Sequence, residues 1–290
     1  MKKRKILIFL LVIGALFTLT GCTIPKDAET GKFIYITAET TFSSIMQSEN
    51  WFTAIFVFPL ASLINKMVAV GINVGVAIAV LTLLVHSVIL ALTWKSNVQQ
   101  AKMQEIQPEL SKIQKKYEGK KDEQSRMKQA QEMQNLYKKN DVNPLGTMLS
   151  TFVQFPVIIA MYQAVQRAEA VATGSFLGLS LEQTPLAGIQ SGQYGYVILF
   201  ALMIVAQLAG MRIPTFLTER RGRKEAERKH IKYEKPKNAM QNQMYIMILF
   251  ISVLAISWPA AMSLYWMISS VVNVLKQVVI HKMIGKETNK

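Results

Sequence analysis

Five stretches of the chain are almost free of charge and long enough to cross a lipid bilayer. They are residues 72–94, 145–166, 194–211, 240–258 and 260–281. A hydrocarbon core of about 30 Å needs roughly 20 apolar residues in a helix. The last two stretches meet at Trp258-Pro259, and proline disfavours helix in the residue before it, so a tight turn is expected there. The pattern predicts an all-α membrane protein with five transmembrane helices.

A sixth apolar stretch, residues 51–70, contains Pro59, Asn65 and Lys66. If it crossed the membrane, every later segment would change sides and the strongly basic loop after residue 94 would lie outside. Positively charged loops mark the cytoplasmic side. We therefore interpret residues 51–70 as an amphipathic helix at the outer membrane interface, with a spanning helix as the alternative.

The polar segment 95–142 has two helix-spaced rows of apolar residues. The first row is Met103, Ile106, Leu110, Ile113 and Tyr117, and the second is Met127, Ala130, Met133 and Tyr137. A period of three and four is typical of one face of a helix. Gly119 lies between the rows, so the segment predicts a cytoplasmic helical hairpin with a thin, methionine-rich contact surface. A solvated spacer between two membrane spans is the alternative.

Composition and charge agree with this topology. Of the 290 residues, 51% are hydrophobic and only 18% charged, and the mean hydropathy is +0.23, which is too apolar for an ordinary soluble domain. The formal net charge of +15 is concentrated in two segments. Residues 95–141 hold eleven Lys or Arg against seven acids, residues 212–237 hold ten against four, and residues 169–193 hold no base.

The charge therefore indicates which segments lie inside. The basic loop at 212–239 and the tail at 282–290 are expected in the cytoplasm, and the neutral loop near 169–193 outside. The charge has a second interpretation, contact with ribosomal RNA or with anionic lipid.

The N-terminus has the pattern of an exported lipoprotein. A basic start, MKKRK, precedes an apolar run, and Leu19 to Cys22 read LTGC, which resembles the bacterial lipobox. This predicts a signal peptide at residues 1–21, acylation of Cys22 outside the cell membrane, and an extracytoplasmic segment at 22–50. Two or three acyl chains give durable anchoring, at about 0.8 kcal/mol per buried methylene. An uncleaved transmembrane helix is the alternative.

Four ordered segments together resemble the YidC, Oxa and Albino family of membrane protein insertases, in its Gram-positive lipoprotein form. They are INVGVAIAVLTLLVHSVILALTWK, KMQEIQPEL, NPLGTMLSTFVQFPVIIAMYQAV and WPAAMSLYWMISSVVNVLKQ. The resemblance extends from about Trp51 to Lys282. It implies five transmembrane helices around a hydrophilic groove that opens to the cytoplasm and to lipid, and through which a nascent membrane protein is inserted without nucleotide or metal.

Polar residues within the apolar stretches are consistent with such a groove, because polar groups in hydrocarbon face a protein interior or water. They are Thr82, His86, Gln154, Gln163, Gln207 and Asn273. By resemblance, the candidate groove residues are Thr82, His86, Gln154, Tyr265 and Trp266. For the aromatic pair Tyr265 and Trp266, simple packing is the alternative.

His86 departs from the family pattern. The family carries the motif T-x-x-V-R, whereas this chain has Thr82-Leu-Leu-Val85-His86. Arginine is permanently charged, but histidine is largely neutral at pH 7. Three hypotheses follow: a weaker insertase, a paralogue for substrates with few acidic residues, or a pH-responsive groove. A histidine that only makes a structural hydrogen bond is the fourth.

Other function classes fit less well. The three histidines fall in separate regions, and the single cysteine excludes a cysteine metal cluster, so we expect no enzyme, no metal site and no cofactor. A small secondary transporter would show internal repeats and coupling carboxylates, and we find neither. A non-inserting assembly chaperone is the remaining alternative. Expected partners are nascent membrane proteins and lipids, with the ribosome and the Sec translocon as further candidates, and we expect a monomer.

Overall fold

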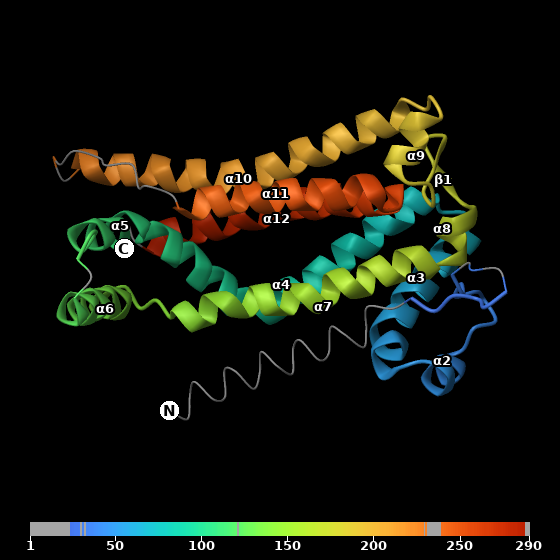
Figure 1. The fold of residues 1–290 in the computed structure, drawn as a ribbon, viewed down its shortest axis with the longest axis horizontal. Helices are drawn as coiled ribbons and strands as arrows, with labels where there is room; N and C mark the ends of the chain where they lie inside the picture. The colour runs from blue at the N-terminus through green and yellow to red at the C-terminus, as the bar shows by residue number, and fades with distance from the viewer. Residues whose placement is uncertain are drawn as a thin grey trace. The chain divides into compact units, whose positions relative to one another are not determined.

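The computed structural model describes residues 24–29, 31, 33–120, 122–228, 230 and 239–287. The expected signal peptide and Cys22 lie outside this part. The described residues are mostly helical (Figure 1). The elements are α2 Phe42–Ser48, η1 Thr53–Val57, α3 Phe58–Ala69, α4 Val74–Glu105, α5 Gln107–Lys116, α6 Glu123–Lys139, α7 Pro144–Arg167, α8 Glu169–Thr173, β1 Ser175–Phe176, β2 Leu179–Ser180, α9 Pro185–Gln190, α10 Gly195–Arg228, α11 Ala239–Ser257 and α12 Ala260–Glu287.

The chain forms two compact units. The first comprises residues 1–84, 154–201 and 254–265, and the second comprises residues 85–153, 202–253 and 266–290. The division falls inside α4, α7, α10, α11 and α12, so each of these helices contributes one end to each unit.

The core of the first unit is apolar and tightly closed. Its fully buried side chains include Ile64, Ile78, Leu81, Met161, Tyr196 and Met262 from helices and Leu181 from the segment between β2 and α9. Backbone hydrogen bonds join the start of α12 to the segment between β2 and α9: the amides of Ala260 and Ala261 donate to the carbonyls of Gln183 and Leu181, at 2.9 and 3.0 Å. These bonds satisfy amides that a helix N-terminus otherwise leaves without partners.

A short antiparallel hairpin, β1 with β2, lies in the loop between α7 and α10. Leu177 and Gly178 form its turn with positive φ values of 51° and 79°, which is the geometry of a tight two-residue hairpin turn. The ring of Phe176 lies directly over Gly75 of α4, where a Cβ would come within 2.1 Å of the ring. The absence of a side chain at Gly75 is therefore required for this contact.

The expected helix at residues 51–70 is helical from Trp51 to Ala69, with a π-helical turn at Thr53–Val57. Pro59 follows the π-helical turn directly within this continuous helix, where it cannot donate a backbone hydrogen bond to the preceding turn. Asn65 is partly buried, and its side-chain amide bonds to backbone groups at Ile36 and Ala170. The polar residue that distinguished this stretch from a simple membrane span thus joins three segments of the first unit.

In the second unit, α5 and α6 lie side by side (Figure 1). Their contact contains Ile106, Leu110, Leu136 and Val142, with Met103, Ile113, Met133 and Tyr137 packed around them. Most of the two predicted rows therefore pack together. The prediction was wrong for Met127, which is 68% exposed, and for Ala130, which is also exposed. Leu136 provides the buried contact on α6 instead.

Polar contacts fix the turn between α5 and α6. Gly119 adopts a φ of +84°, and the Asp122 carboxylate accepts from the Ser125 amide at 2.7 Å, which caps α6. Lys116 and Tyr117 donate to Glu132 at 2.6 and 2.9 Å. The hydrogen bonds from Lys116 and Tyr117 lower the pKa of the Glu132 carboxyl.

Three helices continue beyond the expected ends of their membrane spans. α4 continues past Trp94 to Glu105 because no helix breaker precedes Pro108. α10 continues to Arg228, so residues 212–228 of the predicted basic loop are helical. α12 continues past residue 281 to Glu287, so most of the predicted tail is helical. Apolar composition indicates which part of a helix lies in the membrane, but it does not show where the helix ends. Arg, Lys, Glu and Ala favour helix in water as well.

Three of the described helices are long and apolar enough to cross a membrane: Val74–Glu105, Gly195–Arg228 and Ala260–Met283. Shorter apolar helical segments are Thr53–Ala69 and Ile248–Ser257. The two other expected spans, 145–166 and 240–258, correspond to α7 with 24 residues and α11 with 19 residues.

The α5–α6 contact gives a first prediction. Truncation of the buried Leu110 side chain (L110A) removes packing on both helices and is expected to destabilise the hairpin by about 2–5 kcal/mol. M127A, at an exposed site on α6, is the matched control and is expected within about 0.5 kcal/mol of wild type. Hydrogen exchange of the hairpin amides measures both. Equal exchange in the two variants would contradict a packed α5–α6 contact.

Candidate functional site

Thr82 and His86 lie one turn apart on the buried face of α4. The Thr82 side chain is 0% exposed and His86 is 7% exposed, whereas Leu83, Leu84 and Val88 are about half exposed. The Thr82 hydroxyl donates to the Ile78 carbonyl at 2.7 Å. Both polar side chains therefore face the protein interior, and the large apolar side chains of this segment form its outer surface.

Gln154 is partly buried on α7, two residues before Pro156, which lies inside the helix. A proline there removes one backbone hydrogen bond of the helix. Further along α7, Gln163 and Gln166 are also buried. Within the described part of the chain, the amide nitrogen of Gln166 has no hydrogen-bond partner.

Tyr265 and Trp266 belong to a segment of α12 that is buried on all sides. Every residue from Ala260 to Trp266 is buried, and Tyr265 is 1% exposed. The hydroxyl of Ser263 in this segment has no hydrogen-bond partner among the described residues. The aromatic pair thus lies in the interior.

The five predicted groove residues divide between the two units. Thr82, Gln154 and Tyr265 belong to the first unit, and His86 and Trp266 to the second. Each is buried or partly buried, but no single unit contains all five.

Two polar residues of the second unit are buried, Gln207 on α10 and Ser269 on α12. The two helices approach each other near these residues. A Cβ on Gly210 would come within 3.7 Å of the Ser270 carbonyl. Gln207 is one turn before Gly210, and its side chain is 9% exposed. In the described part of the chain, neither the Gln207 amide nitrogen nor the Ser269 hydroxyl has a hydrogen-bond partner. A buried polar atom without a protein partner is costly unless water reaches it.

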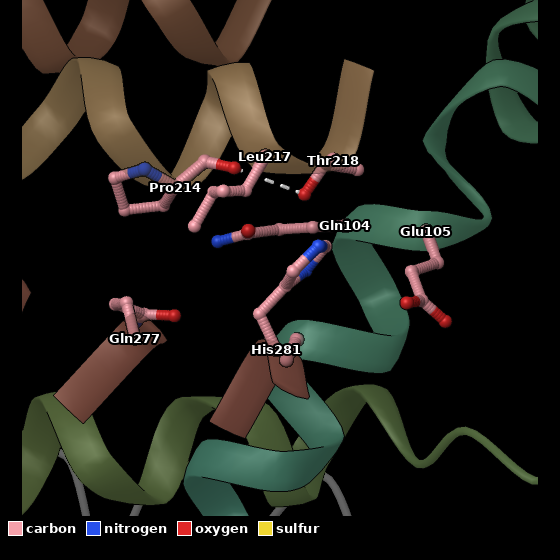
Figure 2. A pocket seen from close by; sticks show the side chains of 8 residues that line it. Gln104, Glu105, Pro214, Leu217, Thr218, Gln277 and His281 are labelled. Atoms are coloured by element: carbon pink, nitrogen blue, oxygen red, sulfur yellow. Dashed lines mark hydrogen bonds between the residues drawn. The ribbon is translucent and has the colours of Figure 1, made fainter. Parts of the chain in front are cut away.

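A small cleft lies between the ends of α4, α10 and α12 in the second unit (Figure 2). The side chains of Gln104 and His281 lie beside each other at this cleft (Figure 2). On α10, the Thr218 hydroxyl donates to the Pro214 carbonyl at 3.1 Å. The cleft is lined by Ala101, Gln104, Glu105, Pro214, Leu217, Thr218, Gln277 and His281.

Arg221 holds the three helix ends beside this cleft. Its guanidinium forms an ion pair with Glu105 of α4 and donates to the His281 carbonyl of α12 at 2.9 Å. Both charged side chains are largely buried, at 18% and 25% exposure. One side chain from the basic extension of α10 therefore joins the ends of α4 and α12.

The comparisons with known proteins agree on one family. The family profile described as 60Kd inner membrane protein matches residues 64–287. The membrane protein insertase YidC of Oceanobacillus iheyensis is 33% identical, over 81% of this chain and 85% of that protein. The membrane protein insertase MisCA of Bacillus subtilis is 31% identical, over 92% and 88%. The membrane protein insertase YidC 2 of Bacillus anthracis is 33% identical, over 78% and 79%.

The chain belongs to the YidC family of membrane protein insertases. It is accordingly a multi-pass membrane protein whose substrates are nascent membrane proteins. The resemblance in the four sequence segments is confirmed. Among the described residues, no group of three His, Cys, Asp or Glu side chains is arranged to hold a metal ion.

Sequence reasoning missed Arg221 and Glu105 in this insertase. They are 116 positions apart, and each belongs to a segment of mixed charge. The basic run of α10 indicated membrane topology, but it contained no signal that Arg221 pairs with Glu105 of α4. The helical continuation of α10 past Met211 would have been needed to find it.

The Arg221 contact gives a second prediction. R221A removes an ion pair and a charged hydrogen bond, so it is expected to lower the local stability of the ends of α4 and α12 by about 1.5–3 kcal/mol. The backbone amides there should therefore exchange hydrogen faster. The neighbouring Arg220 is exposed, and R220A serves as the control, with exchange as in wild type. Hydrogen exchange read at residues 100–106 separates the two variants. Unchanged exchange there in R221A would show that Arg221 does not hold the helix ends.

Proposed function

We propose that this insertase moves the polar segments of nascent membrane proteins through a hydrated groove that opens to the cytoplasm. The groove is formed by five transmembrane helices, α4, α7, α10, α11 and α12. Thr82, His86, Gln154, Tyr265 and Trp266 line it. A wet groove shortens the dry path that a polar segment must cross, and the apolar segment of the substrate moves into lipid.

The observation that carries this proposal is buried polarity within apolar helices. Thr82 and His86 face inward on α4, and Gln207 and Ser269 have buried polar atoms without partners in the described part of the chain. Each such atom costs several kcal/mol in a dry apolar setting, on the order of 2–7 by transfer measurements. Water in the interior removes this cost, and a hydrated interior is what insertion requires.

His86 sets the character of the groove. A neutral imidazole offers one donor and one acceptor, whereas an arginine offers a fixed charge and five donors. The groove of this chain therefore attracts acidic substrate residues weakly at neutral pH. We favour substrates whose transferred segments carry few acidic residues.

The topology follows from the same proposal. Cys22 is acylated at the outer face, residues 51–69 lie along the outer interface, and the α5–α6 hairpin and the C-terminus lie in the cytoplasm. The basic extension of α10 agrees with this orientation, because basic segments remain inside. The insertase works as a monomer in contact with membrane lipids, and the ribosome and the Sec translocon are its candidate partners.

A third prediction tests insertion and the role of His86 together. The purified protein is reconstituted into liposomes with a newly synthesised single-span substrate. The wild type is expected to give protease-protected substrate. H86R adds a permanent charge and is expected to increase insertion of a substrate with acidic residues in its transferred segment, by about tenfold if the added charge is worth roughly 1.4 kcal/mol. A matched substrate with neutral residues serves as the control.

Each alternative has its own result in this assay. Solute uptake without protected substrate indicates a transporter, and substrate kept soluble without protection indicates an assembly chaperone. Equal insertion by wild type, H86R, H86K and H86A with both substrates would remove His86 from the mechanism.

The lipid anchor gives a fourth prediction. Acyl chains on Cys22 carry the extracytoplasmic segment to the membrane, and C22S abolishes the acylation site. The expected result is loss of radiolabelled palmitate from the protein, with the N-terminus still at residue 1 because cleavage at a lipobox requires the cysteine. Palmitate labelling and N-terminal sequencing measure both. Unchanged labelling in C22S would contradict the lipoprotein assignment.

A further inference from the structure

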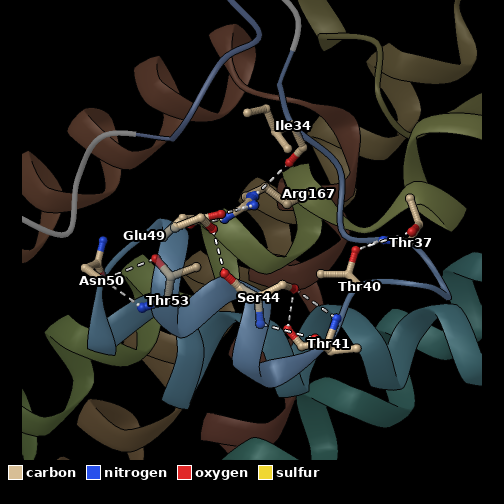
Figure 3. Close-up of polar contacts among 10 residues, drawn as sticks. Ile34, Thr37, Thr40, Thr41, Ser44, Glu49, Asn50, Thr53 and Arg167 are labelled. Atoms are coloured by element: carbon tan, nitrogen blue, oxygen red, sulfur yellow. Dashed lines mark hydrogen bonds and ion pairs between the residues drawn. The ribbon is translucent and has the colours of Figure 1, made fainter.

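Arg167, the last residue of α7, has a fully buried guanidinium. Its side chain is 0% exposed and forms a two-point ion pair with the Glu49 carboxylate, at 2.7 Å for both bonds. Its Nε donates to the Ile34 carbonyl at 2.9 Å (Figure 3). Glu49 and Ile34 both belong to the segment before α3, more than one hundred positions from Arg167.

The same segment caps the end of α7 through its backbone. The Ile36 amide donates to the Arg167 carbonyl at 2.6 Å, and the Glu169 amide donates to the Ile36 carbonyl at 3.3 Å. Ile36 and Ala168 form a parallel bridge, and both are 0% exposed. A helix C-terminus otherwise has carbonyls without partners, so this segment completes α7.

Asn65 of α3 also forms hydrogen bonds where the N-terminal segment meets the end of α7. Its side-chain amide donates to the Ile36 carbonyl at 2.6 Å, and its oxygen accepts from the Ala170 amide at 3.1 Å. One asparagine thus joins α3, the N-terminal segment and α8. All these contacts lie within the first unit.

The hold on this N-terminal segment is mainly polar. Between residues 33 and 49, Ile36 and Ile45 are the buried side chains among those described. Thr41 and Ser44 cap the start of α2 reciprocally (Figure 3). At the end of α2, the Glu49 amide donates to the Ile45 carbonyl. A segment with so little apolar burial is released easily when its polar contacts are lost, and these contacts include the buried Arg167–Glu49 ion pair.

We propose that residues 33–49 form a strap that Arg167 fastens across the outer end of α7, and that Arg167 is a positioning residue which keeps this end of the insertase closed. α7 also carries Gln154, so its position affects the groove. The inference rests on the proposed function for the assignment of this end to the outer face. Closure at this end confines hydration to the cytoplasmic side.

A single-cysteine reporter tests the strap directly. Cys22 is the one native cysteine, and its expected acylation blocks its thiol. A168C places a thiol under the strap, and L177C places one on the exposed hairpin turn, where the native side chain is 84% exposed. Intact cells are treated with a membrane-impermeant maleimide, and the parent without a reporter cysteine gives the background.

With the strap in place, A168C is expected to label slowly and L177C rapidly. R167A leaves the Glu49 carboxylate without its partner, and removal of one member of a buried ion pair is strongly destabilising. Labelling of A168C in the R167A background should therefore rise roughly a hundredfold, with L177C unchanged. Equal labelling of A168C with and without R167A would overturn the strap.

Two rescue variants distinguish positioning from general destabilisation. The charge exchange E49R with R167E restores an ion pair and is expected to recover slow labelling in part, because the bond to Ile34 is lost. A second variant adds I36C and A168C to R167A. Ile36 and Ala168 are partners in a β-bridge, and the spacing of about 4.8 Å between bridged segments suits a disulfide. Oxidation should restore insertion per folded molecule to the wild-type level, and reduction should remove it.

The outcomes for the strap and for the proposed function are separable. Faster labelling in R167A with unchanged insertion per folded molecule would overturn Arg167 as a positioning residue, whatever the groove does. Labelling of L177C in inverted vesicles but not in intact cells would overturn the proposed orientation instead. A wild-type protein that gives no protected substrate in liposomes would overturn the groove and leave the labelling result intact.

Discussion

A polar atom inside an apolar helix must find a partner in the protein or in water, and this requirement governs both units of the molecule. The long helices carry glutamine, serine, threonine and histidine at positions that are buried. Burial of such groups costs free energy unless they form hydrogen bonds. Some of these side chains have hydrogen-bond partners in the protein, and others have buried polar atoms with none among the described residues.

The first unit meets the requirement with protein partners at the end of α7. The Arg167 guanidinium, the Asn65 amide and the backbone of Ile36 form a set of hydrogen bonds with donor–acceptor distances of 2.6 to 3.3 Å. Elsewhere, Gln166 and Ser263 in the first unit and Gln207 and Ser269 in the second have buried polar atoms without partners among the described residues. Such an atom costs free energy unless water reaches it.

Continuous helices extend this arrangement beyond the apolar segments. α10 carries the basic residues after Met211 as helix, and Arg221 turns back to Glu105 and to the His281 carbonyl. The α5–α6 hairpin begins directly after Glu105. The ion pair therefore lies at the base of the hairpin.

The sequence by itself determined the family, the helical class and most of the helix positions, because apolar runs, Trp258-Pro259 and the rows on α5 and α6 are local patterns. It also identified Thr82 and His86 as polar residues within an apolar stretch, and both are buried. Only the tertiary structure decided that α4, α10 and α12 continue past their apolar runs, and that Arg167 meets Glu49, Arg221 meets Glu105 and Phe176 covers Gly75. These contacts join residues about 100 or more positions apart, and their partners are chosen by packing, which no local periodicity records.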